Sequence, residues 1–144
     1  MTLRRVIVLI MAGALMAACS AGPSKDIKGT VEEWHITLSP TIGLAGAVTF
    51  TVTNNGEKEH EFIIRKTDLT SDKLKLNADG TVIEDDPSLA AVGDPSEIGE
   101  IKPGTSNRNV TVTLKAGHYV VFCNLHVGSL LHYQKGMHAD FTVQ

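Results

Sequence analysis

Apolar and polar side chains alternate in several separate stretches of this chain, and the two-residue period limits its possible folds more than any other property. In residues 33–38 the apolar members are Trp34, Ile36 and Leu38. The pattern recurs in three further triplets of apolar residues, which are Val48, Phe50 and Val52, then Val110, Val112 and Leu114, then Ala139, Phe141 and Val143. Successive side chains of a strand point to opposite faces, so each stretch predicts a strand with one buried face. No stretch shows the sustained 3.6-residue period of an amphipathic helix.

Short turn sequences separate these stretches. They are Asn54-Asn55-Gly56, Asp79-Gly80, Lys102-Pro103-Gly104 and Lys115-Ala116-Gly117. Apolar runs at 62–64 and 119–122 fit buried strands. Many short strands joined by such turns predict an all-β protein, an antiparallel β-sandwich. Residues 68–100 are mostly polar, and we expect them to cross the surface as a long excursion with a short strand near 81–84.

The first eighteen residues have the form of an export signal. Arg4 and Arg5 precede a thirteen-residue apolar run at 6–18, which is shorter than the roughly 20 residues that a membrane-spanning helix needs. The run ends in Leu-Met-Ala-Ala followed by Cys19, which resembles the bacterial lipoprotein box, where the cysteine becomes the lipid-modified first residue. An ordinary cleaved signal or an uncleaved anchor is the alternative.

This processing would divide the chain into three parts. Residues 1–18 are the lipoprotein-type signal peptide, residues 19–29 are the lipidated Cys19 with a flexible tether, and residues 30–144 are one domain. The protein would then lie outside the cytoplasm, attached to the bacterial membrane through Cys19, in the periplasm or at the cell surface.

Charge and length exclude several classes of protein. The chain has 144 residues, 42% of them hydrophobic, and 16 acidic against 13 basic residues. It is therefore too apolar for a disordered chain and lacks the basic clusters of a nucleic-acid binder. We expect one monomeric domain with a single site.

A lone thiol is the first indication of what that site contains. If Cys19 is acylated, Cys123 has no cysteine to pair with, although exported proteins commonly use their cysteines in pairs. Cys123, His126, His132 and Met137 fall within fifteen residues, between two predicted strands. A cysteine with two histidines in a plane and a distant methionine is the ligand set of blue copper. A further imidazole must come from elsewhere, and His60 lies where a loop enters an apolar strand.

Each of these residues also has an ordinary structural interpretation. Cys123 alone would be assigned as a small buried hydrophobe, and Met137 as core filler. Their coincidence with a predicted strand–loop–strand favours a metal site. The other histidines are excluded: His35 lies on a polar strand face, His118 lies about 16 Å from Cys123 at strand rise, and His138 points away from Met137.

The sequence resembles the cupredoxins, the blue-copper family, and specifically their small exported bacterial members. The motifs are Asn-x-Gly followed by His60-Glu61-Phe62, then Gly117-x-Tyr119-x-x-x-Cys123, then His132-x-x-x-Gly136-Met137 before a final strand. The resemblance covers residues 30–144. It implies a Greek-key β-sandwich that holds one type 1 copper ion, with His60, Cys123, His132 and Met137 as ligands.

The loop after Cys123 departs from the family pattern. Eight residues separate Cys123 from His132, where many relatives have two or four, and His126 stands at the shorter spacing. We favour His132 because its four-residue gap to Met137 fits the family's usual spacing, and His126 remains the alternative ligand. Glu61 and Asn124 could hydrogen-bond across the two ligand loops.

The resemblance implies a one-electron carrier that is not an enzyme and that exchanges electrons with redox partner proteins. Copper enzymes of this fold need His-x-His pairs, and the sequence has none. A copper chaperone or storage protein and a metal-free β-sandwich binding module are the alternatives. Apolar residues around the loop would form a rim on which a partner docks; they are Leu125, Val127, Leu130, Leu131 and Tyr133.

Overall fold

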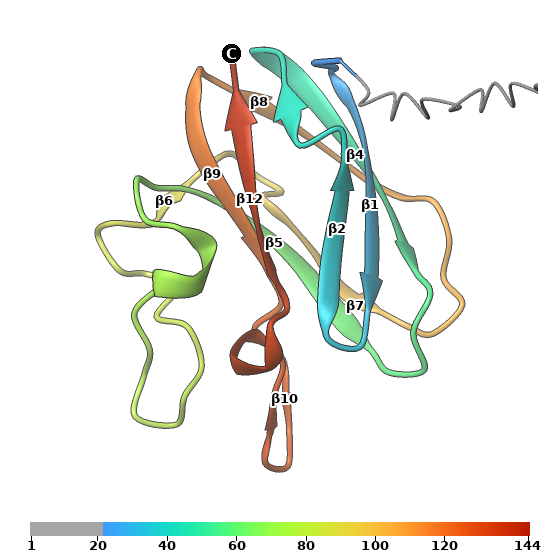
Figure 1. The fold of residues 1–144 in the computed structure, drawn as a ribbon, viewed down its shortest axis with the longest axis vertical. Helices are drawn as coiled ribbons and strands as arrows, with labels where there is room; N and C mark the ends of the chain where they lie inside the picture. The colour runs from blue at the N-terminus through green and yellow to red at the C-terminus, as the bar shows by residue number, and fades with distance from the viewer. Residues whose placement is uncertain (1–21) are drawn as a thin grey trace, which may run out of the picture.

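The structure is a computed structural model that describes residues 22–144 (Figure 1). The predicted signal peptide at 1–18 and the predicted lipidation site Cys19 lie outside the described residues. Two β-sheets stack face to face around a common core, so the prediction of an all-β sandwich is confirmed. Within residues 22–144, no helix is long and apolar enough to cross a membrane.

The first sheet has the strand order β2-β1-β4-β8. Its strands are β1 (Asp26–Glu32), β2 (His35–Ser39), β4 (Gly46–Asn54) and β8 (Arg108–Leu114). The second sheet has the order β3-β12-β9-β5-β6, and β7 also pairs with β5. Its strands are β3 (Ile42–Gly43), β5 (His60–Lys66), β6 (Ala90–Ala91), β7 (Glu97–Ile101), β9 (Gly117–Phe122) and β12 (His138–Val143).

The sheets are mixed rather than purely antiparallel, which corrects the prediction. β1 lies parallel to β4, and β12 lies parallel to β3. The cause is the path of the chain between β1 and β4: after the β1–β2 hairpin it crosses to the second sheet at β3, and it then returns beside β1 in the same direction.

The alternating stretches supply the core, as expected. Val48, Phe50 and Val52 of β4 are fully buried, and Val110 of β8 and Phe141 of β12 face the same interior. The polar residues between them are exposed or half-buried. Burial of this apolar area is the main stabilising contribution to such a fold.

The ordered domain begins earlier than the predicted boundary at residue 30. β1 starts at Asp26 and pairs along its length with β4, so residues 26–29 belong to the sheet and not to a tether. The alternating pattern does not reveal the start of this strand, because Gly29 occupies an inward-facing position and has no apolar side chain. A Cβ there would lie 3.1 Å from the side chains of Phe62 and Val52, so the inter-sheet packing requires a small residue.

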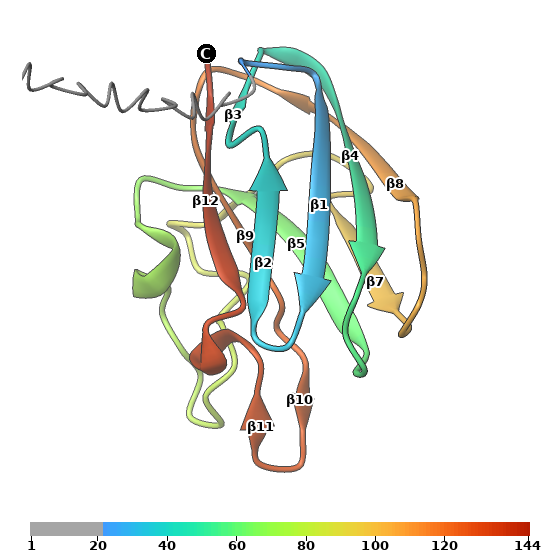
Figure 2. The ribbon, with the colours of Figure 1, turned by 45° about the vertical axis from the view of Figure 1, so that its right-hand side comes forward.

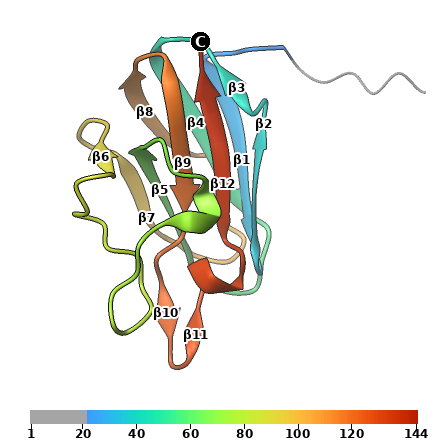
Figure 3. The ribbon, with the colours of Figure 1, turned by 60° about the vertical axis from the view of Figure 1, so that its left-hand side comes forward.

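Residues 68–100 are more structured than a surface excursion, a second correction. They contain the short 3-10 helix η1 (Ser71–Lys73), β6 and β7, and the strand expected near 81–84 is a single bridge between Leu76 and Val82. The segment covers the face of the second sheet that is turned away from β1 and β4 (Figures 1 and 3). It buries a second apolar cluster there, made of Ile63, Leu74, Val82, Leu89, Val120, Phe122 and Tyr133. β5 and β9 are therefore covered on both faces, which explains their unbroken apolar runs.

The loop between β9 and β12 forms a small protruding hairpin. Its strands are β10 (His126–Val127) and β11 (Leu130–Leu131), and the 3-10 helix η2 (Tyr133–Lys135) follows. Figure 2 shows this hairpin at the end of the sandwich where the β1–β2 turn also lies, opposite the C-terminus and the start of β1. Of the predicted docking rim, Val127 is exposed, whereas Tyr133 is buried in the second cluster and cannot contribute.

Candidate metal centre

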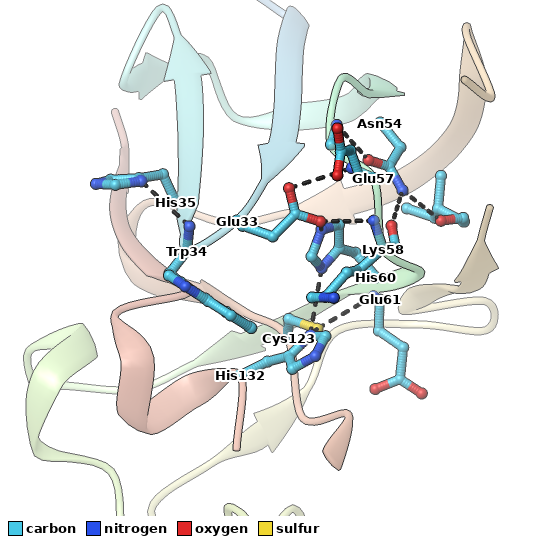
Figure 4. Close-up of polar contacts among 12 residues, drawn as sticks. Glu33, Trp34, His35, Asn54, Glu57, Lys58, His60, Glu61, Cys123 and His132 are labelled. Carbon is cyan, nitrogen blue, oxygen red and sulfur yellow. Dashed lines mark hydrogen bonds and ion pairs between the residues drawn. The ribbon is translucent and has the colours of Figure 1, made fainter. Parts of the chain in front are cut away.

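Three of the four predicted ligands converge at this end of the sandwich. His60 Nδ1 lies 3.3 Å from His132 Nδ1, and Cys123 Sγ lies 3.4 Å from His132 Nδ1 (Figure 4). The three potential donor atoms lie within 4.8 Å of one another, and all three side chains are fully buried. Two nitrogens and one sulfur thus surround one point.

A closed turn delivers His60 to this point. The amide of Asn54 donates to the backbone oxygens of Lys58 and Ile101, at 2.7 Å each, and its Oδ1 accepts from the N–H of Gly56 at 2.8 Å. The side chain of Asn54 thereby closes the turn that follows β4. His60 then opens β5 with its ring turned inward.

Cys123 follows the last residue of β9 and is fixed by its backbone. Its N–H donates to the oxygen of Met137 at 3.1 Å, and its Sγ accepts from the N–H of Glu61 at 3.3 Å. Glu61 is the neighbour of His60, so one contact links the two ligand-bearing segments. Met137 is fully buried in the apolar cluster that also contains Cys123.

The long ligand loop is closed at its base. The N–H of His132 donates to the oxygen of Leu125 at 3.1 Å, and the N–H of Met137 donates to the oxygen of His132 at 3.1 Å. Residues 126–131 therefore leave and return as a hairpin without displacing His132. Gly136 ends η2 with a φ of 112°, a conformation that favours glycine.

The remaining histidines lie away from the position that His60, Cys123 and His132 surround. His126, the alternative ligand, is exposed in β10 and faces Leu131 across the hairpin. His35 is exposed, His118 contacts Thr67 and Asp140, and His138 contacts the hydroxyl of Ser71.

Burial determines the charge of the three converging groups. It lowers the pKa of His60 and of His132, so both imidazoles are neutral near pH 7. Burial also raises the pKa of the Cys123 thiol to about 11. The metal-free thiol is consequently protonated, and a metal ion must displace that proton to bind sulfur.

A hydrogen bond joins the two ligand loops, but it runs from the N–H of Glu61 to Cys123 Sγ at 3.3 Å, and among residues 22–144 the expected bond between the side chains of Glu61 and Asn124 is not formed. Burial and the nearby Glu84 raise the pKa of the Glu61 carboxyl. The side chain of Asn124 has a different role: its Oδ1 accepts from the N–H of Val82 at 2.6 Å, and its amide donates to Glu84 at 2.8 Å. Asn124 therefore joins the ligand loop to the 68–100 segment.

Two residues of the β1–β2 turn complete the surroundings, and neither was predicted. Glu33 Oε1 lies 3.4 Å from His60 Nε2, and the ring of Trp34 meets that of His132 edge-on, with centroids 5.1 Å apart. The sequence contains an indirect signal for this turn. Val31 and Ile36 are both apolar but lie five positions apart, an odd interval that one strand cannot place on one face.

The donor set fits a soft or borderline ion. A thiolate, two imidazole nitrogens and a nearby buried thioether match the trigonal type 1 copper set, whereas a hard cation such as Mg²⁺ prefers oxygen. The observed convergence therefore agrees with the chemistry predicted for Cys123 and its neighbours.

Comparison with known proteins shows similarity in fold but none in sequence families. No family model matches the chain, and no curated protein does. Among solved structures, the auracyanin of Roseiflexus castenholzii is 19% identical with a TM-score of 0.56, covering 85% of this chain and 99% of its own. Auracyanin A of Chloroflexus aurantiacus, described as a "blue" copper protein, is 21% identical with a TM-score of 0.55, covering 84% and 99%. Rusticyanin of Thiobacillus ferrooxidans is 17% identical with a TM-score of 0.53, covering 86% and 79%. At these identities the likeness establishes the fold alone.

Proposed function

Because this chain has the cupredoxin fold, as its resemblance to that family implied, we propose that it binds one type 1 copper ion and carries single electrons. The proposed ligands are His60, Cys123, His132 and Met137. The observation that carries the proposal is the convergence of two Nδ1 atoms and one Sγ within 4.8 Å, all buried, at one end of the sandwich. Auracyanin A, described as a "blue" copper protein, and rusticyanin, described as a copper protein, have a similar fold and support the proposal.

The protein supplies metal-ligating atoms that are held in place and shielded from water. Bound copper would supply a one-electron couple between its two oxidation states. His60 is held by the Asn54 turn, Cys123 by Met137 and Glu61, and His132 by Leu125. These backbone contacts do not depend on the charge of the ion, so the donors need little rearrangement between oxidation states. Burial excludes water and keeps the imidazoles neutral and ready to bind.

Full burial of the donors favours a carrier over a copper chaperone. A chaperone must pass its ion to a partner's ligands, and such exchange needs exposed donors. Here the side chains of His60, Cys123 and His132 are all enclosed. Because these three side chains have no exposed surface among residues 22–144, we propose that the protein is a carrier and not an enzyme.

The visible spectrum of the purified protein with one equivalent of Cu(II) tests this function. We expect an intense thiolate-to-copper band and a reversible one-electron wave in voltammetry. Cys123→Ser should lose both, while Thr111→Ser, which changes an exposed strand position, should keep both. A wild-type protein without the band would refute the proposal, and rapid loss of copper to a chelator would favour the chaperone.

We further propose that the protein works outside the cytoplasm, anchored to the membrane by lipid on Cys19. The support is the signal-like sequence at 1–18 and its lipoprotein-like end. Labelling cells with a radioactive fatty acid would test it. The wild-type protein should carry label and sediment with membranes, and Cys19→Ala should do neither. An unlabelled wild-type protein would contradict the anchor.

A further inference from the structure

The turn between β1 and β2 places the carboxylate of Glu33 against the outer nitrogen of His60. Glu33 Oε1 lies 3.4 Å from His60 Nε2, an ion-pair distance. Among residues 22–144, this Nε2 is a buried polar atom that makes no hydrogen bond. The other ring nitrogen, Nδ1, faces His132 and the candidate metal position. Figure 4 shows Glu33 and Cys123 on opposite sides of the His60 ring.

The carboxylate is held in this position from the opposite side. Its Oε2 accepts from the N–H of Glu57 at 3.1 Å, and its Oε1 accepts from the N–H of Lys58 at 2.5 Å. Both donors belong to the turn that also delivers His60. Gly56 leaves the space that the carboxylate occupies, because a Cβ at Gly56 would lie 2.6 to 2.9 Å from its atoms. The turn is thus shaped around the Glu33 carboxylate.

Resting on the proposed copper function, we propose that Glu33 is a positioning residue that holds His60 with its proton on Nε2 and lowers the reduction potential of the bound ion. A carboxylate beside Nε2 favours the Nε2–H tautomer, which leaves the lone pair of Nδ1 for the metal. Its fixed negative charge also stabilises the higher charge of Cu(II) relative to Cu(I). In the test, an electrode supplies the electron that reduces the bound copper ion. Glu33 neither breaks a bond nor gains or loses a proton in this step.

Replacing the charge is the first test. Glu33→Gln keeps the size of the side chain and removes its charge, and we expect the reduction potential of the copper-loaded protein to rise. An increase of at least tenfold in the reduction equilibrium constant, about 59 mV for one electron, is the expected result. Glu32→Gln is the matched control, because it removes an equal charge from the neighbouring exposed residue. An equal shift in the two variants would overturn the proposal.

Moving the charge without removing it is the second test, and it remains valid if Glu33→Gln disturbs the turn. Gly56→Ala would push the carboxylate away from its place while leaving the net charge unchanged. We expect its potential to rise in the same direction as that of Glu33→Gln. A potential equal to that of the wild type would show that the position of the carboxylate does not tune the site.

The metal-free protein provides a readout that does not depend on copper. Nitrogen NMR of the histidine rings should show His60 protonated at Nε2 in the wild type and a mixture of tautomers in Glu33→Gln. A wild-type His60 protonated at Nδ1 would overturn the proposed role. If the wild type shows no copper band, the proposed function fails, and the tautomer of His60 still decides whether Glu33 orients the ring.

Discussion

Two histidines compete for one position in the candidate centre, and their surroundings differ sharply. His132 is fully buried with Nδ1 3.4 Å from Cys123 Sγ, whereas His126 is exposed on the protruding hairpin. We therefore expect His132→Ala to abolish the thiolate-to-copper band and His126→Ala to leave it intact. The visible spectrum of each variant with one equivalent of Cu(II) provides the measurement. Bleaching by His126→Ala alone would reverse the assignment.

The Cys123 thiol gives copper binding a defined pH dependence. Its pKa of about 11 means that the metal-free thiol is protonated at neutral pH, and the lowered pKa values of the two histidines mean that each imidazole is neutral, with one ring nitrogen free to bind a metal without losing a proton. Binding should release one proton per copper between pH 7 and pH 9, and affinity should rise about tenfold per pH unit as proton competition falls. Proton release can be measured in weak buffer with an indicator dye. Release of no proton would mean that the thiolate already exists in the metal-free protein.

Trp34 is the half-buried residue that meets the enclosed His132 ring. Its ring centroid lies 5.1 Å from that of His132, and part of the side chain reaches solvent. We expect Trp34→Leu to slow oxidation of the reduced protein by hexacyanoferrate(III), because the electron loses the aromatic contact that leads outward. Stopped-flow absorbance follows the reaction, with Val127→Ala on the exposed hairpin as control. Equal rates in all three proteins would contradict this path.

At the scale of elements, the end of η2 depends on one glycine. Gly136 has a φ of 112°, and a Cβ there would lie 3.3 Å from the backbone oxygen of Trp34. Gly136→Ala should lower the free energy of unfolding by about 1–2 kcal/mol, the cost of forcing a side chain into that backbone conformation. Gly99→Ala in β7, where a Cβ meets open space, is the control. Urea denaturation of the metal-free proteins measures both changes, and equal stability of the two variants would refute the prediction.

The strands that could be predicted are those with one face in the core. β4, β8 and β12 alternate over most of their length, and the structure buries their large apolar side chains. The start of β1 was missed because Gly29 fills an inward position that has no room for an apolar side chain. The 68–100 segment was misjudged because it buries only isolated residues, such as Leu74 and Leu89, which leave no periodic pattern.

The residues of the candidate site also fall into those that the sequence predicts and those that it does not. Soft donors are rare enough that Cys123 and Met137 stand out in sequence, and His132 follows from its spacing to Met137. Glu33 and Trp34 could not be predicted, because their roles depend on tertiary contacts: Glu33 meets His60, 27 positions further along the chain, and Trp34 meets His132, 98 positions further along. Contacts of that kind are properties of the tertiary structure alone.

At the scale of the whole molecule, the proposed ligands link separate parts of the sandwich. His60 opens β5, while Cys123, His132 and Met137 lie between β9 and β12. Because a metal that binds only the folded state stabilises it, free copper at 100 times its dissociation constant should add about 2.7 kcal/mol to the stability. Thermal unfolding should show a higher Tm with copper for the wild type and no increase for Cys123→Ser. An unchanged Tm for the loaded wild type would contradict folding-linked binding.

The described chain enters β1 at one end of the sandwich, and the candidate centre lies at the other (Figure 2). If the proposed lipid on Cys19 holds the protein to a bilayer from its N-terminal side, the proposed copper site therefore faces the aqueous compartment rather than the lipid. Reaction partners would then approach the candidate centre from the aqueous side, while the opposite end of the sandwich faced the lipid.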